Sequence, residues 1–199
     1  MDFEHLNIST QNHITRITLN RPEVLNAINV RMHAELQMAF DVFAADATQY
    51  ICVVIGAGSR AFCAGSDLKA IAKNEGPVEY PANGYAGLIE RYDLDTPIIA
   101  AVDGIAVGGG FELALACDII LATRRSVFGL PEPLIGRMAL GGGVHRLARQ
   151  IGLKQAMGMI LGSESVEADK AFTMGIVTCL LYTSPSPRDQ RGSGMPACG

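Results

Sequence analysis

The stretch GIAVGGGFELALACD, residues 104–118, places three consecutive glycines directly before a carboxylate and an apolar, helix-forming run. Glycine inside a helix or strand costs about 0.5–1 kcal/mol relative to alanine, so this triplet needs a physical reason. A glycine corner that ends a strand and opens a helix leaves N–H groups unpaired at the positive end of the helix dipole. Such a corner suits the close approach of a ligand carbonyl. A flexible link between strand and helix is the alternative.

The residues before this corner predict strands that alternate with helices. HITRITLN (13–20) alternates apolar and polar residues, which is typical of a half-buried strand. YICVVIGAG (50–58) and PIIAAVDGIAVGG (97–109) are typical of strands buried on both faces. Between the first two runs, apolar residues recur at the spacing of one helix face: Ile28, Met32, Leu36, Phe40 and Phe43. This alternation implies right-handed crossovers, a mainly parallel sheet and an α/β fold.

The residues after the corner predict a further strand region and then helices. IILATRRSVFGLPE (119–132) is predicted as strand, and residues 141–176 are predicted as helical. Within the helical region, Ser165 is the expected N-cap of the last helix and Gly175 its expected end. For the methionines of this part of the chain we expect packing in the core: Met138, Met157 and Met159.

The end of the chain differs in composition from the rest. Residues 181–199 contain three prolines and three glycines with almost no periodic apolar content, so they cannot bury enough surface to become ordered. We therefore expect one domain over residues 1–178. Residues 179–199 are expected to form an unstructured tail that is foreign to this domain.

Composition and charge exclude several classes of function. The chain has 199 residues, of which 49% are hydrophobic, so it is long enough to bury a core. Its net charge of −4, without a basic cluster, argues against nucleic-acid binding. The start MDFEHLNIST is not a signal sequence and no run is long enough to span a bilayer, so we expect a cytoplasmic protein without membrane partners. The five cysteines and four histidines lack metal-ligand spacing, so neither a metal site nor a disulfide is expected.

A second small-residue loop, SRAFCAGSDLKA (59–70), follows the predicted strand at residues 51–55. Its backbone N–H groups are little obstructed and could hold an oxyanion. The alternative is an ordinary turn between strand and helix with Gly65 at positive φ. The glycine corner lacks the context of G-x-G-x-x-G and the lysine of a P-loop, so nucleotide cofactors are disfavoured.

Two carboxylates stand near these loops in apolar surroundings. Glu112 falls in the first helical turn after the glycine corner, and Glu132 follows the next strand between two prolines. If the two converge on one site their titrations couple, which leaves one able to accept a proton and the other able to give one. Alternatively, Glu112 stabilises a helix N-terminus and Glu132 is a surface acid at the end of a strand.

Four motifs in this order resemble the crotonase superfamily of acyl-CoA enzymes, and its enoyl-CoA hydratase branch in particular. The motifs are LNRPEVLNAI (19–28), AFCAGSDL (61–68), VDGIAVGGGFELALACD (102–118) and FGLPEPLIG (128–136). The resemblance covers residues from about 5 to 178. It implies a crotonase-like spiral of repeated ββα units, here with its C-terminal helical part incomplete. It also implies an acyl-CoA thioester substrate, no cofactor apart from the coenzyme A of that substrate, and a homotrimer or dimer of trimers.

The same resemblance implies roles for individual residues. The N–H groups of Ser66 and Gly109 would form an oxyanion hole, with Glu112 as the base toward water and Glu132 as the acid that protonates the α-carbon. Further residues would bind the substrate: Val24, Leu25, Ala27, Ala64, Asp67, Leu68, Gly108 and Pro131. Because both acids are present, a hydratase is favoured. An enoyl-CoA isomerase, a related acyl-CoA lyase and an inactive CoA-binding fragment stay open as alternatives.

Overall fold

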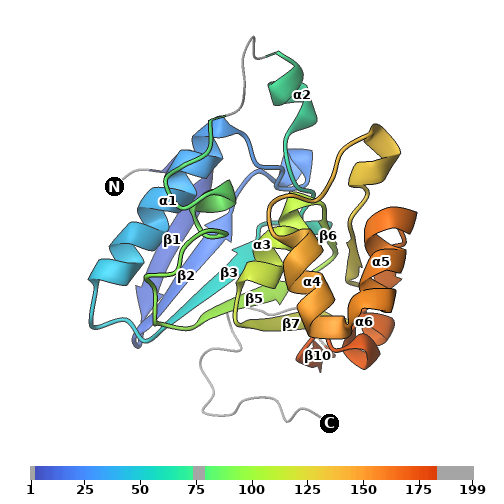
Figure 1. Cartoon of the computed structure of the whole chain (residues 1–199). Helices are drawn as coiled ribbons and strands as arrows, with labels where there is room; N and C mark the ends of the chain where they lie inside the picture. Colours follow the sequence, from blue (N-terminus) through green and yellow to red (C-terminus); the bar gives the residue numbers. More distant parts are fainter. Residues whose placement is uncertain (1–2, 74–78, 183–199) are drawn as a thin grey trace.

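The computed structural model describes residues 3–73 and 79–182, which form two sheets with helices packed around them (Figure 1). The larger sheet has the strand order β1 (Leu6–Gln11), β2 (Ile14–Leu19), β3 (Ile51–Gly56), β5 (Ile98–Val102), β7 (Ile119–Thr123) and β10 (Cys179–Leu181). The smaller sheet has the order β4 (Ala61–Cys63), β6 (Ile105–Val107), β8 (Val127–Gly129) and β9 (Val166–Glu167). Only the pairs β1–β2 and β8–β9 are antiparallel in these sheets. The predicted α/β class with a mainly parallel sheet is therefore confirmed.

The helices follow the strands in a regular pattern. The α-helices of the described residues are α1 (Val30–Ala45), α2 (Leu68–Ala72), α3 (Gly109–Ala116), α4 (Gly143–Ile151), α5 (Leu153–Gly162) and α6 (Ala168–Met174). The short 3-10 helices are η1 (Pro22–Val24), η2 (Tyr85–Gly87) and η3 (Glu132–Ile135). The units β3–β4–α2, β5–β6–α3 and β7–β8–η3 each give their first strand to the larger sheet and their second to the smaller. This repetition confirms the expected spiral of ββα units.

The runs predicted as strand over 97–109 and 119–132 each divide into two strands that lie in different sheets. The first run turns at Asp103 and Gly104, between β5 and β6. A side chain cannot replace the hydrogen of Gly104, because its φ is +81° and a Cβ would lie 2.3 Å from the Arg60 carbonyl oxygen. This turn carries the chain from the larger sheet to the smaller one.

One part of the core forms where α1 packs against the larger sheet (Figure 1), and the same core continues through α3 and the smaller sheet to α4 and α5. Asn29 caps this helix, because its side chain accepts a hydrogen bond of 2.8 Å from the Met32 N–H. The predicted apolar face is confirmed, since its five residues are buried: Ile28, Met32, Leu36, Phe40 and Phe43. Of these, Ile28 precedes the helix, which begins at Val30.

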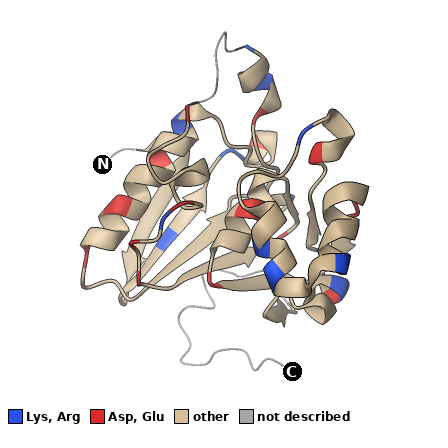
Figure 2. Cartoon of the chain, viewed as in Figure 1, with Lys and Arg blue, Asp and Glu red and all other residues tan. Residues whose placement is uncertain are grey.

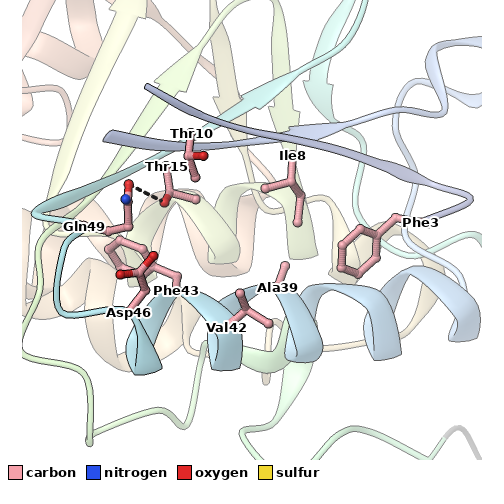
Figure 3. Close-up of a pocket in the computed structure, with 9 residues that line it drawn as sticks. All are labelled: Phe3, Ile8, Thr10, Thr15, Ala39, Val42, Phe43, Asp46 and Gln49. Carbon is pink, nitrogen blue, oxygen red and sulfur yellow. Dashed lines mark hydrogen bonds between the residues drawn. The ribbon is translucent and has the colours of Figure 1, made fainter. Parts of the chain in front are cut away.

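A hollow of about 280 Å³ lies between β1–β2 and α1 (Figure 3). Apolar side chains such as Ile8, Val42 and Phe43 form most of its wall, and Thr15 donates a hydrogen bond of 3.1 Å to Gln49 at one end. No residue of the four sequence motifs lines it. It is therefore separate from the predicted site.

The region predicted as helical over residues 141–176 contains a short strand as well as helices. Ser165 was predicted to cap the last helix, which is wrong, because Val166 and Glu167 pair with β8 as strand β9 and α6 begins only at Ala168. The predicted end at Gly175 is confirmed by its left-handed φ of +85°. Core packing is confirmed for Met159, whereas Met138 and Met157 are exposed.

The expected domain boundary after residue 178 needs a correction. Residues 179–181 form β10, which pairs in parallel with β7 at the edge of the larger sheet. Three residues, Cys179–Leu181, are too few to show a strand periodicity in the sequence, so this strand was not predicted. The rest of the expected tail, residues 183–199, lies outside the described residues.

Positive and negative side chains are interspersed over the described residues (Figure 2). Within this part of the chain, no helix combines the length and apolarity that crossing a bilayer requires. Across the same residues, no group of three His, Cys, Asp or Glu side chains is placed to hold a metal ion.

Candidate active site

The glycine corner is required by its close contacts. Gly108 precedes α3 with a φ of +55°, a conformation that residues with a side chain rarely adopt. A Cβ on Gly109 would lie 2.2 Å from the Tyr85 hydroxyl oxygen, and a Cβ on Gly110 would lie 2.1 Å from the Cys63 carbonyl oxygen. The triplet is therefore not a flexible link, because each of its glycines meets a separate steric requirement.

Replacing Gly110 with alanine is expected to lower the free energy of unfolding by about 2–3 kcal/mol, the upper part of the usual cost of overpacking. The reason is that α3 must move away from the end of β4 to make room for the methyl group. Gly158→Ala is the matched control, since this glycine lies exposed inside α5 and its Cβ would have only ordinary contacts. That control should gain up to about 1 kcal/mol. Urea unfolding of both variants measures the difference, and equal midpoints would contradict this explanation of the triplet.

The two small-residue loops meet at the start of α3. A Cβ on Gly65 would lie 2.9 Å from the Gly109 nitrogen and 3.0 Å from the Val107 carbonyl oxygen, so the loop after β4 touches the glycine corner. Gly65 has the positive φ expected of a turn, +86°. Within the described part of the chain, the N–H groups of Ser66 and Gly109 have no hydrogen-bond acceptor. Two unpaired donors thus come together from separate ββα units.

Glu112 is buried at this corner, with an exposed fraction of 4%. Its Oε1 accepts a hydrogen bond of 2.8 Å from the Gly143 N–H. Burial raises the pKa of Glu112 to about 7 despite that hydrogen bond, and the nearby charge of Glu132 adds to the rise. At neutral pH this carboxyl group therefore exchanges a proton readily.

Glu132 lies at the start of η3 and lines the same chamber as Glu112. A Cβ on Gly108 would be 3.2 Å from the Glu132 Oε1, so this carboxyl group adjoins the glycine corner too. Its Oε2 is buried and has no hydrogen-bond partner among the described residues. Burial raises the pKa of Glu132. A buried oxygen of this kind is costly unless a ligand or water satisfies it.

Two neighbouring chambers are lined by these groups. One has a volume of about 240 Å³ and includes Leu68, Pro131 and Ile135 in its wall. The other has a volume of about 400 Å³ and includes Glu112, Tyr85 and Met138. Both are lined by the same four residues where they meet: Ser66, Gly109, Glu132 and Arg137. The residues of the two unpaired amides and both acids therefore line the larger chamber, and Glu112 alone of these four is absent from the smaller one.

The residues predicted to bind substrate divide into two groups. Four of them line the smaller chamber: Ala64, Leu68, Gly108 and Pro131. The other four line neither chamber: Val24, Leu25, Ala27 and Asp67. Their part in binding coenzyme A stays a prediction.

Three of the residues outside the chambers, Leu25, Ala27 and Asp67, take part in hydrogen bonds that hold the loop carrying Ser66. The Leu25 carbonyl accepts a hydrogen bond of 3.0 Å from the Ala64 N–H. Arg21 donates to the Ala27 carbonyl at 2.6 Å and to Asp67 at 3.0 Å. Asp67 also caps α2 by accepting from the Ala70 N–H at 3.0 Å. The predicted bracing role of Asp67 therefore has a direct geometric basis.

Sequence reasoning missed Tyr85, whose exposed fraction is 8%. Its hydroxyl lies 3.2 Å from the Ser66 Oγ, although 19 residues separate the two in the chain. The surrounding NGYAG (83–87) shows only an aromatic residue between two small residues, Gly84 and Ala86, which carries no catalytic signal by itself. Cys63, which lies in the loop motif 61–68, is fully buried, and burial raises the pKa of its thiol to about 12, so the thiol keeps its proton.

Comparison with known proteins supports one family. A family model described as Enoyl-CoA hydratase/isomerase matches residues 9–183. A carnitinyl-CoA dehydratase of Proteus mirabilis (strain HI4320) is 39% identical over 174 residues, which are 87% of this chain and 66% of that protein. The chain thus spans less than two thirds of the length of this relative.

Solved structures agree with the sequence comparison. The crystal structure of enoyl-CoA hydratase from Mycobacterium tuberculosis H37Rv matches with a TM-score of 0.85 and 37% identity, covering 94% of this chain and 72% of that one. The structure of a carnitinyl-CoA dehydratase from Mycobacterium avium 104 matches with a TM-score of 0.86 and 38% identity, covering 94% and 73%.

Proposed function

The chain belongs to the enoyl-CoA hydratase/isomerase family, and we propose that it reversibly adds water across the 2,3 double bond of a 2-enoyl-CoA thioester. The observation that carries this proposal is the junction of the two chambers. Around it, Glu112 and Glu132, two acids with raised pKa values, line the larger chamber together with Ser66 and Gly109, whose backbone N–H groups lack acceptors within the described residues. The proposal needs no cofactor, because coenzyme A arrives as part of the substrate.

The two amides would bind the thioester oxygen. When water adds to C3, negative charge moves onto this oxygen as the enolate forms, and the N–H groups of Ser66 and Gly109 would stabilise it. Each such donor contributes roughly 3 kcal/mol in other oxyanion holes. Gly109 is the first residue of α3, so the helix dipole adds to the same effect.

The two acids would hold the water and move its protons. Glu112 takes a proton from the water as the oxygen bonds to C3, and Glu132 gives a proton to C2; dehydration reverses both transfers. The pair must therefore hold one proton between its two carboxyl groups. Burial and the mutual charge of the pair favour this singly protonated form near neutral pH, and the coupled titration belongs to the pair rather than to either residue.

The larger chamber would take the acyl group, because Ile89, Met138 and Leu140 give it apolar surface.

One feature of the wall of the larger chamber favours a second candidate function, a dehydratase for acyl groups that carry a quaternary ammonium, as the names of the carnitinyl-CoA relatives suggest. The rings of Tyr80 and Tyr85, with centroids 5.8 Å apart, and the exposed Glu90 line this chamber. Aromatic faces and carboxylates both attract such a cation. We also propose that the chain assembles as a homotrimer or as a dimer of trimers.

An assay of the purified chain with a 2-butenoyl-CoA tests the proposal. We expect loss of the enoyl absorbance and a 3-hydroxyacyl-CoA product identified by mass spectrometry. A product with a shifted double bond would instead indicate an isomerase, and binding without turnover would indicate a CoA-binding module. A parallel assay with 4-trimethylammonio-2-butenoyl-CoA separates the two hydratase candidates, since the second candidate predicts the higher kcat/KM for that substrate.

A further inference from the structure

One phenolic oxygen contacts both residues that contribute the proposed oxyanion amides. The Tyr85 hydroxyl lies 3.2 Å from the Ser66 Oγ. The same oxygen would be 2.2 Å from a Cβ on Gly109, so only the hydrogen of glycine leaves room for it. Ser66 follows β4 and Gly109 opens α3, so Tyr85 stands between two segments that belong to different ββα units.

The position of Tyr85 is set by α1 rather than by its own short helix. Its ring packs edge-on against His33 of α1, with centroids 4.6 Å apart and an interplanar angle of 82°. His33 also accepts a hydrogen bond of 3.0 Å from the Ala86 N–H through Nδ1. Burial lowers the pKa of His33 to about 4, so it remains a neutral acceptor at physiological pH.

The turn that carries Tyr85 has an unusual backbone. Ala86 adopts a left-handed φ of +56°, and a Cβ on Gly87 would lie 2.5 Å from the Gln37 Cα of α1. Strained backbone of this kind persists only where the surrounding structure enforces it. The phenol is therefore held in a fixed place, and burial raises its pKa so that it keeps its proton.

We propose that Tyr85 is a positioning residue, whose hydroxyl fixes the Ser66 amide relative to the Gly109 amide through the Ser66 side chain. This inference rests on the proposed function. Oxyanion donors act only when they lie about 2.7–3.1 Å from the developing charge, so a small shift of the Ser66 loop weakens the hole. Loss of the Tyr85–Ser66 hydrogen bond should therefore affect the reacting state more than the binding of the CoA thioester.

A double-mutant cycle of Tyr85→Phe and Ser66→Ala tests the inference, because both variants keep the Ser66 N–H. Each single variant is expected to lower kcat about fivefold, the effect of about one neutral hydrogen bond, with KM changed by less than about twofold. The double variant should be no slower than either single variant, since both remove the same contact. Losses that multiply to about 25-fold would overturn the inference, because they would show that Tyr85 acts independently of Ser66.

A measurement without turnover separates this inference from the proposed function. In the free protein, the amide ¹H–¹⁵N resonances of both Ser66 and Gly109 should shift in Tyr85→Phe and in Ser66→Ala. Tyr50→Phe is the control, because Tyr50 is exposed and stacks on His13 away from the site. An unchanged Gly109 resonance in Tyr85→Phe would overturn the positioning role, even if the wild-type chain hydrates enoyl-CoA. Absence of turnover in the wild-type chain, with both resonances shifted, would count only against the proposed function.

Discussion

Replacing Glu132 with glutamine is expected to lower kcat for hydration by about 10²–10⁴-fold, the usual contribution of a general acid or base. Glutamine keeps the shape of the side chain but cannot deliver a proton to C2. The Glu132 Oε2 is buried and has no hydrogen-bond partner among the described residues, so an amide nitrogen in its place breaks no hydrogen bond of that oxygen. KM should change little, because the backbone amides and chamber walls stay in place.

The matched control is Glu167→Gln, an exposed acid that precedes α6 and lies outside both chambers. Its kcat should stay at the wild-type value. Steady-state rates with a 2-enoyl-CoA, measured on both variants and the wild-type chain, make the comparison. If Glu132→Gln retains a kcat within about twofold of wild type, Glu132 is not the acid and the proposed mechanism is wrong.

Those parts of the fold that depend on local pattern could be predicted from the sequence. The apolar face of α1 follows from residues three and four positions apart, and β3 follows from a continuous β-branched run. Where the chain changes sheets, local pattern gives no guide. The runs 97–109 and 119–132 contain possible breaks at Asp103-Gly104 and at residues 124–126, but the pattern does not show that the strands on either side join different sheets. Close contacts such as that of Gly104 with Arg60 accompany this division.

The candidate site shows the same limit. Glu112 and Glu132 could be singled out because acids in apolar, glycine-rich segments are rare, and in the structure both line the larger chamber. Tyr85 could not, because its significance lies in contacts with Ser66, Gly109 and His33 that are remote in the chain. The short β9 was missed for a related reason: two residues are too few for periodicity, and their pairing with β8 overrides the capping preference of Ser165.

Replacing Glu112 with glutamine is expected to stabilise the protein above neutral pH while it removes turnover. The pKa of Glu112 rises from 4.5 to about 7 on folding, chiefly because burial disfavours the charged form. Below pH 4.5 both the folded and the unfolded chain carry the proton, so this group does not penalise folding. As pH rises toward about 7, the unfolded chain releases the proton first, and the free energy of unfolding falls by about 1.4 kcal/mol per pH unit.

Glutamine has no charge to bury, and its oxygen can still accept the hydrogen bond from the Gly143 N–H. The free energy of unfolding of Glu112→Gln, relative to wild type, should therefore increase by about 2–3 kcal/mol between pH 5 and pH 8. Urea titrations of both proteins at the two pH values measure this change, with Glu167→Gln as the control that should show none. A constant difference between wild type and Glu112→Gln would mean that Glu112 is not held protonated by burial. An increase together with lost turnover would instead show that the fold carries this buried acid at a cost in stability for the sake of its chemistry.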